Sequence, residues 1–438
     1  MPAPSAPSPA GGPGESATVA PAVPVGTLAV VSARRPEVEP NNDKKTAQLV
    51  ALDSVVAGEI NDLADVDMFA VVIEKPCELT VMLASASDVV LELRDAAGVV
   101  VAKSDRGGKG VTEGVPNFAV VKGRYIVAVK SFGKAAPVDK PPSKSTPKSA
   151  PTPADADTAT PALAVPLRYE LHVAATTSAP RSGLELEPNL DPGSANDLFI
   201  GEAASGYVGW VGDVDVWKLS VEGLAARSAL DVELSAVEGV TPMFTVTDAV
   251  GRRLVQRQGG KNRVLSVRGL VPVVGPNVPP YYFLAIRGER SNPLAMYRLS
   301  VVARVLSGTD EMEPNDNDAT AQPLLFGQKL MASWQVGDVD SFVIAADATA
   351  RRLTIVIAPT QDADLVGEVV IPDQPIIEFN HRGQGGSETV DIDLPAGRQA
   401  MVRVHGNLKR KTVEGAYEIF VTVAQGEADP MPHEQRAP

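Results

Sequence analysis

Residues 311–315 read Glu-Met-Glu-Pro-Asn, and residues 338–340 read Asp-Val-Asp. Both motifs occur together in two earlier places, at 37–41 with 65–67 and at 185–189 with 213–215. In the three copies the Asp-Val-Asp begins 26, 26 and 25 residues after the second glutamate of the first motif. Chance does not keep one order and one register three times, so the sequence contains three tandem copies of a structural unit.

Alternating apolar residues follow each Asp-Val-Asp. In copy one they are Leu79, Val81 and Leu83, and this period of two is typical of a strand with one buried face. Each copy closes with a strand led by a tyrosine, at Tyr169, Tyr297 and Tyr417. Apolar runs bounded by turn residues number about seven or eight per copy. The pattern predicts an all-β protein of three tandem antiparallel β-sandwich (jelly-roll-like) domains, with little helix.

The copies divide the chain into a Pro/Ala-rich lead, three sandwiches and a tail. We expect the lead and the tail to be disordered, and the boundaries fall at 1–34, 35–178, 179–306, 307–425 and 426–438. Copy one is longer because residues 133–166, rich in Pro, Lys, Ser, Thr and Ala, precede its closing strand. Such a composition buries too little apolar surface to fold, so we predict a disordered insertion in a hairpin. If domain one instead ended near Lys134, residues 167–174 would have no sheet to join.

The composition argues against several classes of partner. A formal charge of −14 and a pI near 4.9 disfavour binding to nucleic acid or to an anionic membrane surface, and favour cations. No apolar run reaches the roughly 18 residues that suggest a transmembrane helix. The lone Cys77 has no internal disulfide partner, and we predict a buried, apolar role for it. We expect a secreted or cell-envelope protein whose export signal or lipid anchor is not present in this chain.

Catalytic motifs are missing from the sequence. It contains no His-Glu-x-x-His, no Gly-x-Ser-x-Gly and no phosphate-binding glycine loop of the required form. The four histidines give little from which to build a triad, and His172 and His405 are expected to be ordinary strand residues. Glycine-rich stretches occupy similar places in all three copies, as turns between strands would. We therefore predict a protein that is not an enzyme.

The acidic motifs offer a different chemistry. Residues i and i+2 of an extended segment point to the same side, so each motif presents two carboxylates together. Proline fixes the backbone where the following asparagine can add an oxygen. If the connection between the motifs folds back, both pairs can meet around one calcium ion, which takes about six to eight oxygen ligands. The alternative is that these residues only cap turns and fix the domain entry, without an ion.

Taken together, Glu-Pro-Asn, Asp-Val-Asp-x-Phe/Trp, the alternating strands and the closing Tyr-x-Leu/Ile-x-Val resemble the bacterial pre-peptidase C-terminal domain. The resemblance covers all three copies and extends to the collagen-binding modules of clostridial collagenases. It implies β-sandwiches that accompany secreted proteases and that in several cases bind calcium through a Glu-x-Glu-x-Asn-Asp segment. Copy three matches this segment fully, whereas copy one has Asn42 and copy two has Leu190 at its last position. We therefore expect copy three to respond most to calcium and copy two least.

The candidate metal ligands combine that segment with the downstream aspartates. They are Glu37, Glu39, Asn41, Asp65 and Asp67 in copy one, Glu185, Glu187, Asn189, Asp213 and Asp215 in copy two, and Glu311, Glu313, Asn315, Asp316, Asp338 and Asp340 in copy three.

The sequence thus predicts a non-catalytic extracellular or cell-surface binding or scaffold protein built of calcium-binding-type modules. Its expected partner is an extracellular protein, a matrix polymer or a polysaccharide. The alternative is an accessory substrate-targeting or maturation module of a secreted hydrolase or peptidase system. Nothing in the sequence fixes the oligomeric state.

Overall fold

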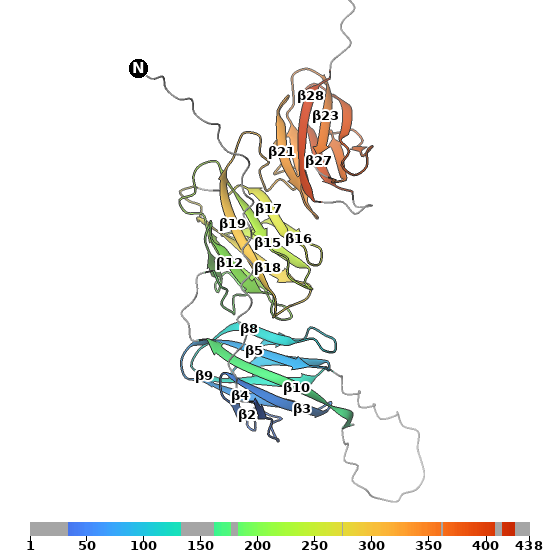
Figure 1. Ribbon diagram of the computed structural model, residues 1–438. Coiled ribbons are helices and arrows are strands. Elements are labelled where there is room, and N and C mark those ends of the chain that lie inside the picture. Colours follow the sequence, from blue (N-terminus) through green and yellow to red (C-terminus); the bar gives the residue numbers. More distant parts are fainter. Residues whose placement is uncertain are drawn as a thin grey trace, which may run out of the picture.

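The computed structural model describes residues 34–132, 162–176, 183–273, 275–360, 362–407 and 414–424. Within these ranges all regular structure is strand, and the strands form three sandwiches that follow one another along the molecule (Figure 1). The predicted all-β sandwich fold is confirmed. No helix suited to crossing a bilayer occurs in the described part of the chain. The predictions of disorder for residues 1–33, 133–161 and 426–438 lie outside the described residues, whereas Arg34, the last residue of the predicted disordered lead, begins a strand, which corrects that bound.

Module one comprises residues 34–132 and 162–176. Its strands are β1 (Arg34–Pro36), β2 (Gln48–Val50), β3 (Ser54–Asp62), β4 (Val66–Ile73), β5 (Cys77–Ser85), β6 (Val89–Arg94), β7 (Val100–Ser104), β8 (Glu113–Val120), β9 (Gly123–Ser131) and β10 (Ala162–Thr176). They form two sheets, with strand orders β1-β3-β10-β5-β8 and β2-β4-β9-β6-β7.

Module two comprises the described residues of 183–306. Its strands are β11 (Asn196–Leu198), β12 (Ala203–Tyr207), β13 (Asp215–Ser220), β14 (Ser228–Leu234), β15 (Pro242–Asp248), β16 (Arg253–Gln258), β17 (Leu265–Leu270), β18 (Tyr281–Gly288) and β19 (Met296–Val305). The sheets have the orders β12-β19-β14-β17 and β11-β13-β18-β15-β16.

Module three comprises the described residues of 307–424. Its strands are β20 (Gln322–Pro323), β21 (Lys329–Trp334), β22 (Val339–Ile344), β23 (Arg351–Pro359), β24 (Leu365–Val370), β25 (Ile377–Phe379), β26 (Glu388–Leu394), β27 (Ala400–Gly406) and β28 (Gly415–Val423). The sheets have the orders β21-β28-β23-β26 and β20-β22-β27-β24-β25.

The three modules share one topology, and module one adds only β1 at a sheet edge. The pairings are antiparallel except for the short leading strands β1, β2, β11 and β20, which pair in parallel. The predicted number of strands per copy was too low, since the described residues form nine or ten. Strands of two or three residues, such as β11 and β20, are too short to show an alternating pattern.

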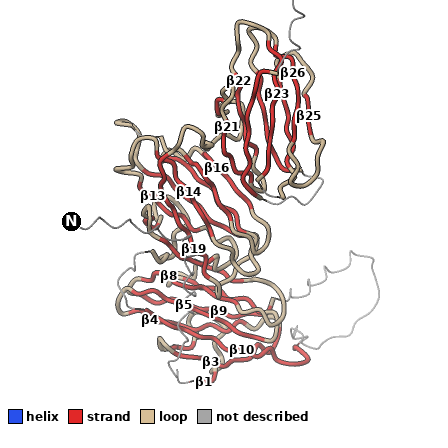
Figure 2. Tube along the Cα trace, turned by 45° about the horizontal axis from the view of Figure 1, so that its top comes forward, coloured by secondary structure: helices blue, strands red, loops and turns tan. Residues whose placement is uncertain are grey.

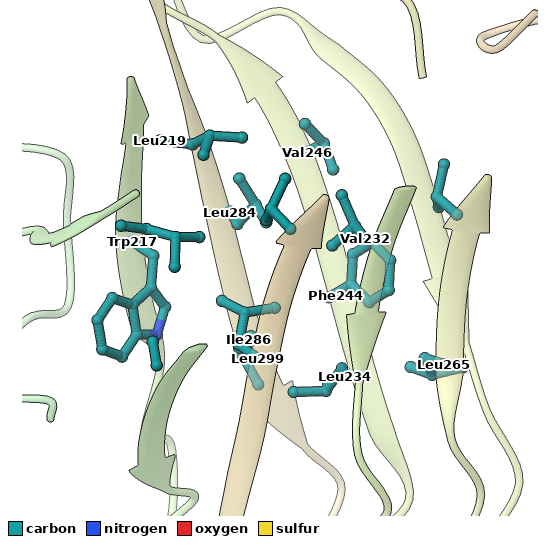
Figure 3. Close-up of a cluster of buried hydrophobic side chains, with 14 of the residues drawn as sticks. Trp217, Leu219, Val232, Leu234, Phe244, Val246, Leu265, Leu284, Ile286 and Leu299 are labelled. Carbon is teal, nitrogen blue, oxygen red and sulfur yellow. The ribbon is translucent and has the colours of Figure 1, made fainter. Parts of the chain in front are cut away.

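Each sandwich has its own hydrophobic core between its two sheets. In module two, Trp217, Leu219 and Leu284 come from one sheet and meet Val232, Leu234 and Leu299 from the other (Figure 3). Every second residue of each strand points inward, which is the physical basis of the period of two in the sequence. Cys77 lies at the edge of the module one core and is half-buried, which corrects the prediction that it is fully buried.

The closing strand β10 of module one follows the segment 133–161 and completes one of the two sheets of that module. It lies between β3 and β5 and pairs with both in antiparallel fashion (Figure 2). It begins at Ala162, which corrects the predicted end of the disordered insertion, because residues 162–166 are strand. The register shifts between Ala162 and Leu167, so the two parts of the strand have separate alignments with β3.

We expect Leu171→Ala to destabilise module one by about 2–5 kcal/mol, because Leu171 is fully buried between β3 and β5 and the substitution leaves a cavity. Val165→Ala in the same strand removes an exposed side chain and should change stability by less than about 0.5 kcal/mol. Urea unfolding of the full chain measures both effects. Equal stability of the two variants would show that β10 is not a core strand of module one.

Candidate metal centres

The two acidic motifs lie side by side in every module. The backbone carbonyl of the motif asparagine accepts a hydrogen bond from the amide that follows the second aspartate, over 3.1, 3.0 and 2.9 Å in modules one, two and three. The peptide bond before the motif proline is cis in all three. The chain between the motifs therefore folds back, as required for the paired carboxylates to converge. In each module one oxygen from each of three carboxylates lies within 4.8 Å of the others: Glu37, Glu39 and Asp67; Glu185, Glu187 and Asp215; Glu313, Asp338 and Asp340.

We call the full candidate sets clusters one, two and three. Cluster one is Glu37, Glu39, Asn41, Asp65 and Asp67; cluster two is Glu185, Glu187, Asn189, Asp213 and Asp215; cluster three is Glu311, Glu313, Asn315, Asp316, Asp338 and Asp340. The structure places every one of these residues in the cluster region of its own module, although Glu39 is exposed and Asp316 is only half-buried.

The tyrosine of each closing strand donates a hydrogen bond into its cluster. Tyr169 Oη donates to Asp67 Oδ2 over 2.7 Å, and Tyr297 Oη donates to Glu185 Oε2 over 3.1 Å. Tyr417 Oη donates to Asp340 Oδ2. The sequence analysis recognised these tyrosines only as strand leaders. Their repetition at the same position of the closing strand in all three copies was the one available signal, because they lie 77 to 112 residues from the carboxylates they contact.

Cluster one is open to solvent. The Glu39 side chain is exposed, and a hollow of about 350 Å3 lies between Glu39, Asn61 and Asp65. Asp67 is buried at the base, where desolvation and the neighbouring Glu37 raise its pKa to about 9. Burial also raises the pKa of Asp65, to a smaller extent. Water can reach part of this cluster, so its charge is partly screened.

Cluster two is closed. All four of its carboxylates and the amide of Asn189 are at most 3% exposed. Main-chain amides satisfy part of the set: Tyr207 N donates to Glu185 over 2.6 Å, and Gly209 N donates to Asp213 over 2.6 Å. Gly206 has no room for a side chain, because a Cβ there would collide with Glu185 and Tyr297. The backbone therefore approaches the carboxylates closely on this side.

Several polar atoms of cluster two have no partner. Both carboxylate oxygens of Asp215 and both side-chain polar atoms of Asn189 are buried without a hydrogen bond, as is Glu187 Oε1. Among the described residues no arginine, lysine or histidine forms an ion pair with this cluster. Burial, followed by mutual repulsion, raises the pKa of Glu185, Asp213 and Asp215 well above the usual range. Burial raises the pKa of Glu187 to about 7.

Cluster three contains a cation supplied by the preceding module. Arg257 of β16 is 2% exposed, and its Nη2 lies 2.6 Å from both Glu313 Oε1 and Asp338 Oδ1. Its Nη1 lies 3.3 Å from Asp316 Oδ1. No signal in the sequence could have assigned Arg257 to this site, because it belongs to a different repeat, 56 residues before Glu313.

The motif backbone also joins neighbouring modules. Glu187 N donates to Asn117 O over 3.1 Å and Ala119 N donates to Glu187 O over 2.6 Å, so cluster two begins on the edge strand β8 of module one. Glu313 makes the same pair of contacts with Gly269 and Val271, next to β17 of module two. Trp210 of module two is buried against Phe118 of module one, with ring centroids 6.2 Å apart. Clusters two and three therefore lie at the two junctions between modules.

Nothing in the structure tests the expected ranking of calcium responses, with copy three first and copy two last, but the structure favours the reverse order. Leu190, the reason to place copy two last, is 44% exposed, so this position contributes little to the buried donor set. In copy three the matching Asp316 is half-buried and contacts Arg257.

No family model matches this sequence, and no curated protein matches it. Similar solved structures include the pre-peptidase C-terminal domain of a collagenase from Bacillus anthracis, with 11% identity, a TM-score of 0.20, and coverage of 29% of this chain and 93% of that chain. They also include the N-terminal CBM22-1-CBM22-2 tandem domain of Xyn10C from Paenibacillus barcinonensis. The identity is 11% and the TM-score is 0.15, and the match covers 47% of this chain and 82% of that chain. At these scores the likenesses do not bear on function, and membership in the pre-peptidase C-terminal family stays a prediction from the motifs.

In a chelating buffer we expect the protein to lose stability as the pH rises from about 5 to 9. The folded state raises the pKa of Glu187 to about 7 and that of Asp67 to about 9, so it holds these protons more tightly than the unfolded chain does. The stability that these two groups contribute is fully present below their pKa values in the unfolded chain. It is lost as the pH rises through their higher pKa values in the folded state. Urea unfolding midpoints across this range measure the effect, and Asp67→Asn should flatten the upper part of the curve. Stability that increased over the same range would contradict the burial of these carboxyls.

Proposed function

We propose that this chain is a non-catalytic extracellular binding or scaffold protein whose sandwiches are held by calcium, with cluster two as the principal ion site. The observation that carries the proposal is the set of four buried carboxylates in cluster two without a basic partner among the described residues. Ionised carboxylates are strongly destabilised when they leave water without a counter-charge. A bound cation would supply that counter-charge, and protonation is the alternative.

The donors of cluster two suit calcium better than other common metals. They are all oxygen atoms, from Glu185, Glu187, Asp213, Asp215 and the amide of Asn189, with no imidazole or thiolate among them. Hard oxygen ligands with several carboxylates favour calcium over zinc or copper. The unpartnered Asp215 and Asn189 oxygens are the atoms that such an ion would use first. A bound calcium would offset two of the four negative charges of the ionised cluster and fix the motif segment that pairs with module one.

Calcium should raise the melting temperature of the full chain, and cluster two should account for most of the rise. Binding to the folded state alone contributes about 1.4 kcal/mol at ten times Kd. Asp215→Asn should abolish most of this response. In chelator at pH 8 the variant should be at least as stable as the wild type, because it replaces a buried carboxyl that has no counter-charge with a neutral amide. Asp197→Asn removes an exposed carboxylate from the same module and serves as the control.

The measurement is thermal unfolding with 5 mM calcium, a value above the ~10⁻⁴ to 10⁻³ M Kd of extracellular calcium modules, compared with unfolding in chelator. An equal melting temperature of the wild type in both buffers would refute calcium binding. A full response in Asp215→Asn would refute the assignment to cluster two.

For the partner we propose an extracellular protein, matrix polymer or polysaccharide that binds module two. A mostly apolar hollow of about 390 Å3 lies between Val250, Pro279, Tyr281 and Tyr282, with Arg252 at its edge. Val250 is 83% exposed, so an apolar side chain stands in solvent beside the hollow. Aromatic and apolar walls with a few polar groups are typical of ligand sites in proteins.

Tyr281→Ala should weaken binding of the full chain to its partner at least about tenfold, as loss of an aromatic anchor does at other interfaces. Immobilised extracellular polymers and culture-medium proteins provide the screen, and surface plasmon resonance provides the affinity. Val121→Ala, which changes an exposed residue of module one, is the control. Unchanged affinity of Tyr281→Ala for the partner found would exclude this hollow as the binding site.

A further inference from the structure

We infer that cluster three is a guanidinium site, filled by Arg257 of module two in place of a metal ion. The chain then has one junction that depends on calcium, between modules one and two, and one that does not, between modules two and three. The calcium dependence of the first junction rests on the function proposed above. The assignment of Arg257 to cluster three rests on the ion pairs of Arg257 itself and not on calcium binding.

The guanidinium occupies the position that a cation would need. Cluster three's convergent carboxylates are Glu313, Asp338 and Asp340, and Arg257 Nη2 lies 2.6 Å from an oxygen of each of the first two. Arg257 is 2% exposed, as buried as Glu313 and Asp338. Burial lowers its pKa, but the surrounding carboxylates offset this and raise it overall, so the side chain keeps its charge. A planar guanidinium can contact several carboxylates at once, which a single ammonium group does less well.

Strand register shows why no arginine of module one enters cluster two at the corresponding position. Arg257 pairs with Phe244, which pairs with Ile286, which pairs with Asp215. In module one the same path from Asp67 leads through Val129 and Leu91 to Ser104. Ser104 is therefore the residue of module one that corresponds to Arg257. Its short side chain donates to Glu113 over 2.6 Å within its own module.

The two junctions are otherwise built alike. Glu187 pairs with the backbone around Phe118, and Glu313 pairs with the backbone around Leu270, the residue equivalent to Phe118 in the strand register. The backbone carbonyl of Lys103, next to Ser104, accepts a hydrogen bond from the backbone amide of Val211 of module two over 3.2 Å. This end of β7 therefore lies at the first junction. Among the described residues, the same backbone contact is therefore combined with a cation inside the acidic cluster at the second junction and with none inside the cluster at the first, where Arg106 of module one instead donates to the backbone carbonyl of Ser291 over 2.7 Å.

The second junction has a further ion pair and a neutral hydrogen bond. Arg304 of module two lies 3.2 Å from Asp310 of module three, and Gln335 donates to Ser266 across the junction. These contacts support a calcium-independent connection between modules two and three.

Calorimetric calcium titration of the full chain tests the inference. Arg257→Ala should bind one more calcium ion than the wild type, because it exposes the carboxylates of cluster three to a metal. Adding Asp340→Asn to this variant should remove the extra ion. Arg253→Ala removes an exposed arginine from the same strand and should leave the wild-type stoichiometry unchanged.

Limited proteolysis of the same proteins reports on the junctions. In the wild type, chelator should speed cleavage between modules one and two but not between modules two and three. In Arg257→Ala, chelator should speed cleavage at the second junction by at least about tenfold, since it leaves buried carboxylates unpaired. Calcium should reverse this. An Arg257→Ala variant that binds no extra ion and keeps its second junction intact in chelator would overturn the inference.

The two proposals fail in different ways. If the wild type binds no calcium but Arg257→Ala opens the second junction, the proposed function fails and the arginine site stands. If Arg257→Ala does not fold, crystals of the wild type grown with terbium in place of calcium decide the question. Anomalous density in cluster two with the guanidinium still in cluster three supports the inference, and a metal ion in cluster three with Arg257 displaced overturns it.

Discussion

Burial of several carboxylates in a small space is the constraint on which the rest of this structure depends. Removing an ionised carboxylate from water is costly, and like charges close together add to the cost. Each module nevertheless brings two acidic motifs together beside its closing strand. Three solutions are present in one chain: cluster one stays partly open to water, cluster two is closed without a basic partner among the described residues, and cluster three encloses Arg257.

The same motif also sets how the modules are joined. The side chains of Glu187 and Glu313 enter a cluster, whereas their backbones pair with the edge of the preceding sandwich. An edge strand is a natural place for such pairing, because its amides and carbonyls are otherwise unpaired. Whatever neutralises the cluster therefore acts directly on the segment that holds two modules together. The acidic clusters and the junctions between modules thus share a few residues.

This shared placement supports the proposed role in binding or scaffolding. In each module the buried acidic groups face one another and form part of the framework of the sandwich. Tandem β-sandwiches joined by short paired segments make a long, regular surface for a partner.

Sequence alone determined the repeat, the β class and the acidic residues that come together. Alternation of apolar residues and the fixed spacing of two motifs are local properties, so they can be read along the chain. The role of Arg257, the closed state of cluster two and the extension of β10 back to Ala162 were decided only by the tertiary structure. These depend on contacts between residues far apart in sequence, in different repeats or beyond a long insertion. No local sequence pattern predicts which side chain of one module will pair with the acidic cluster of the next module.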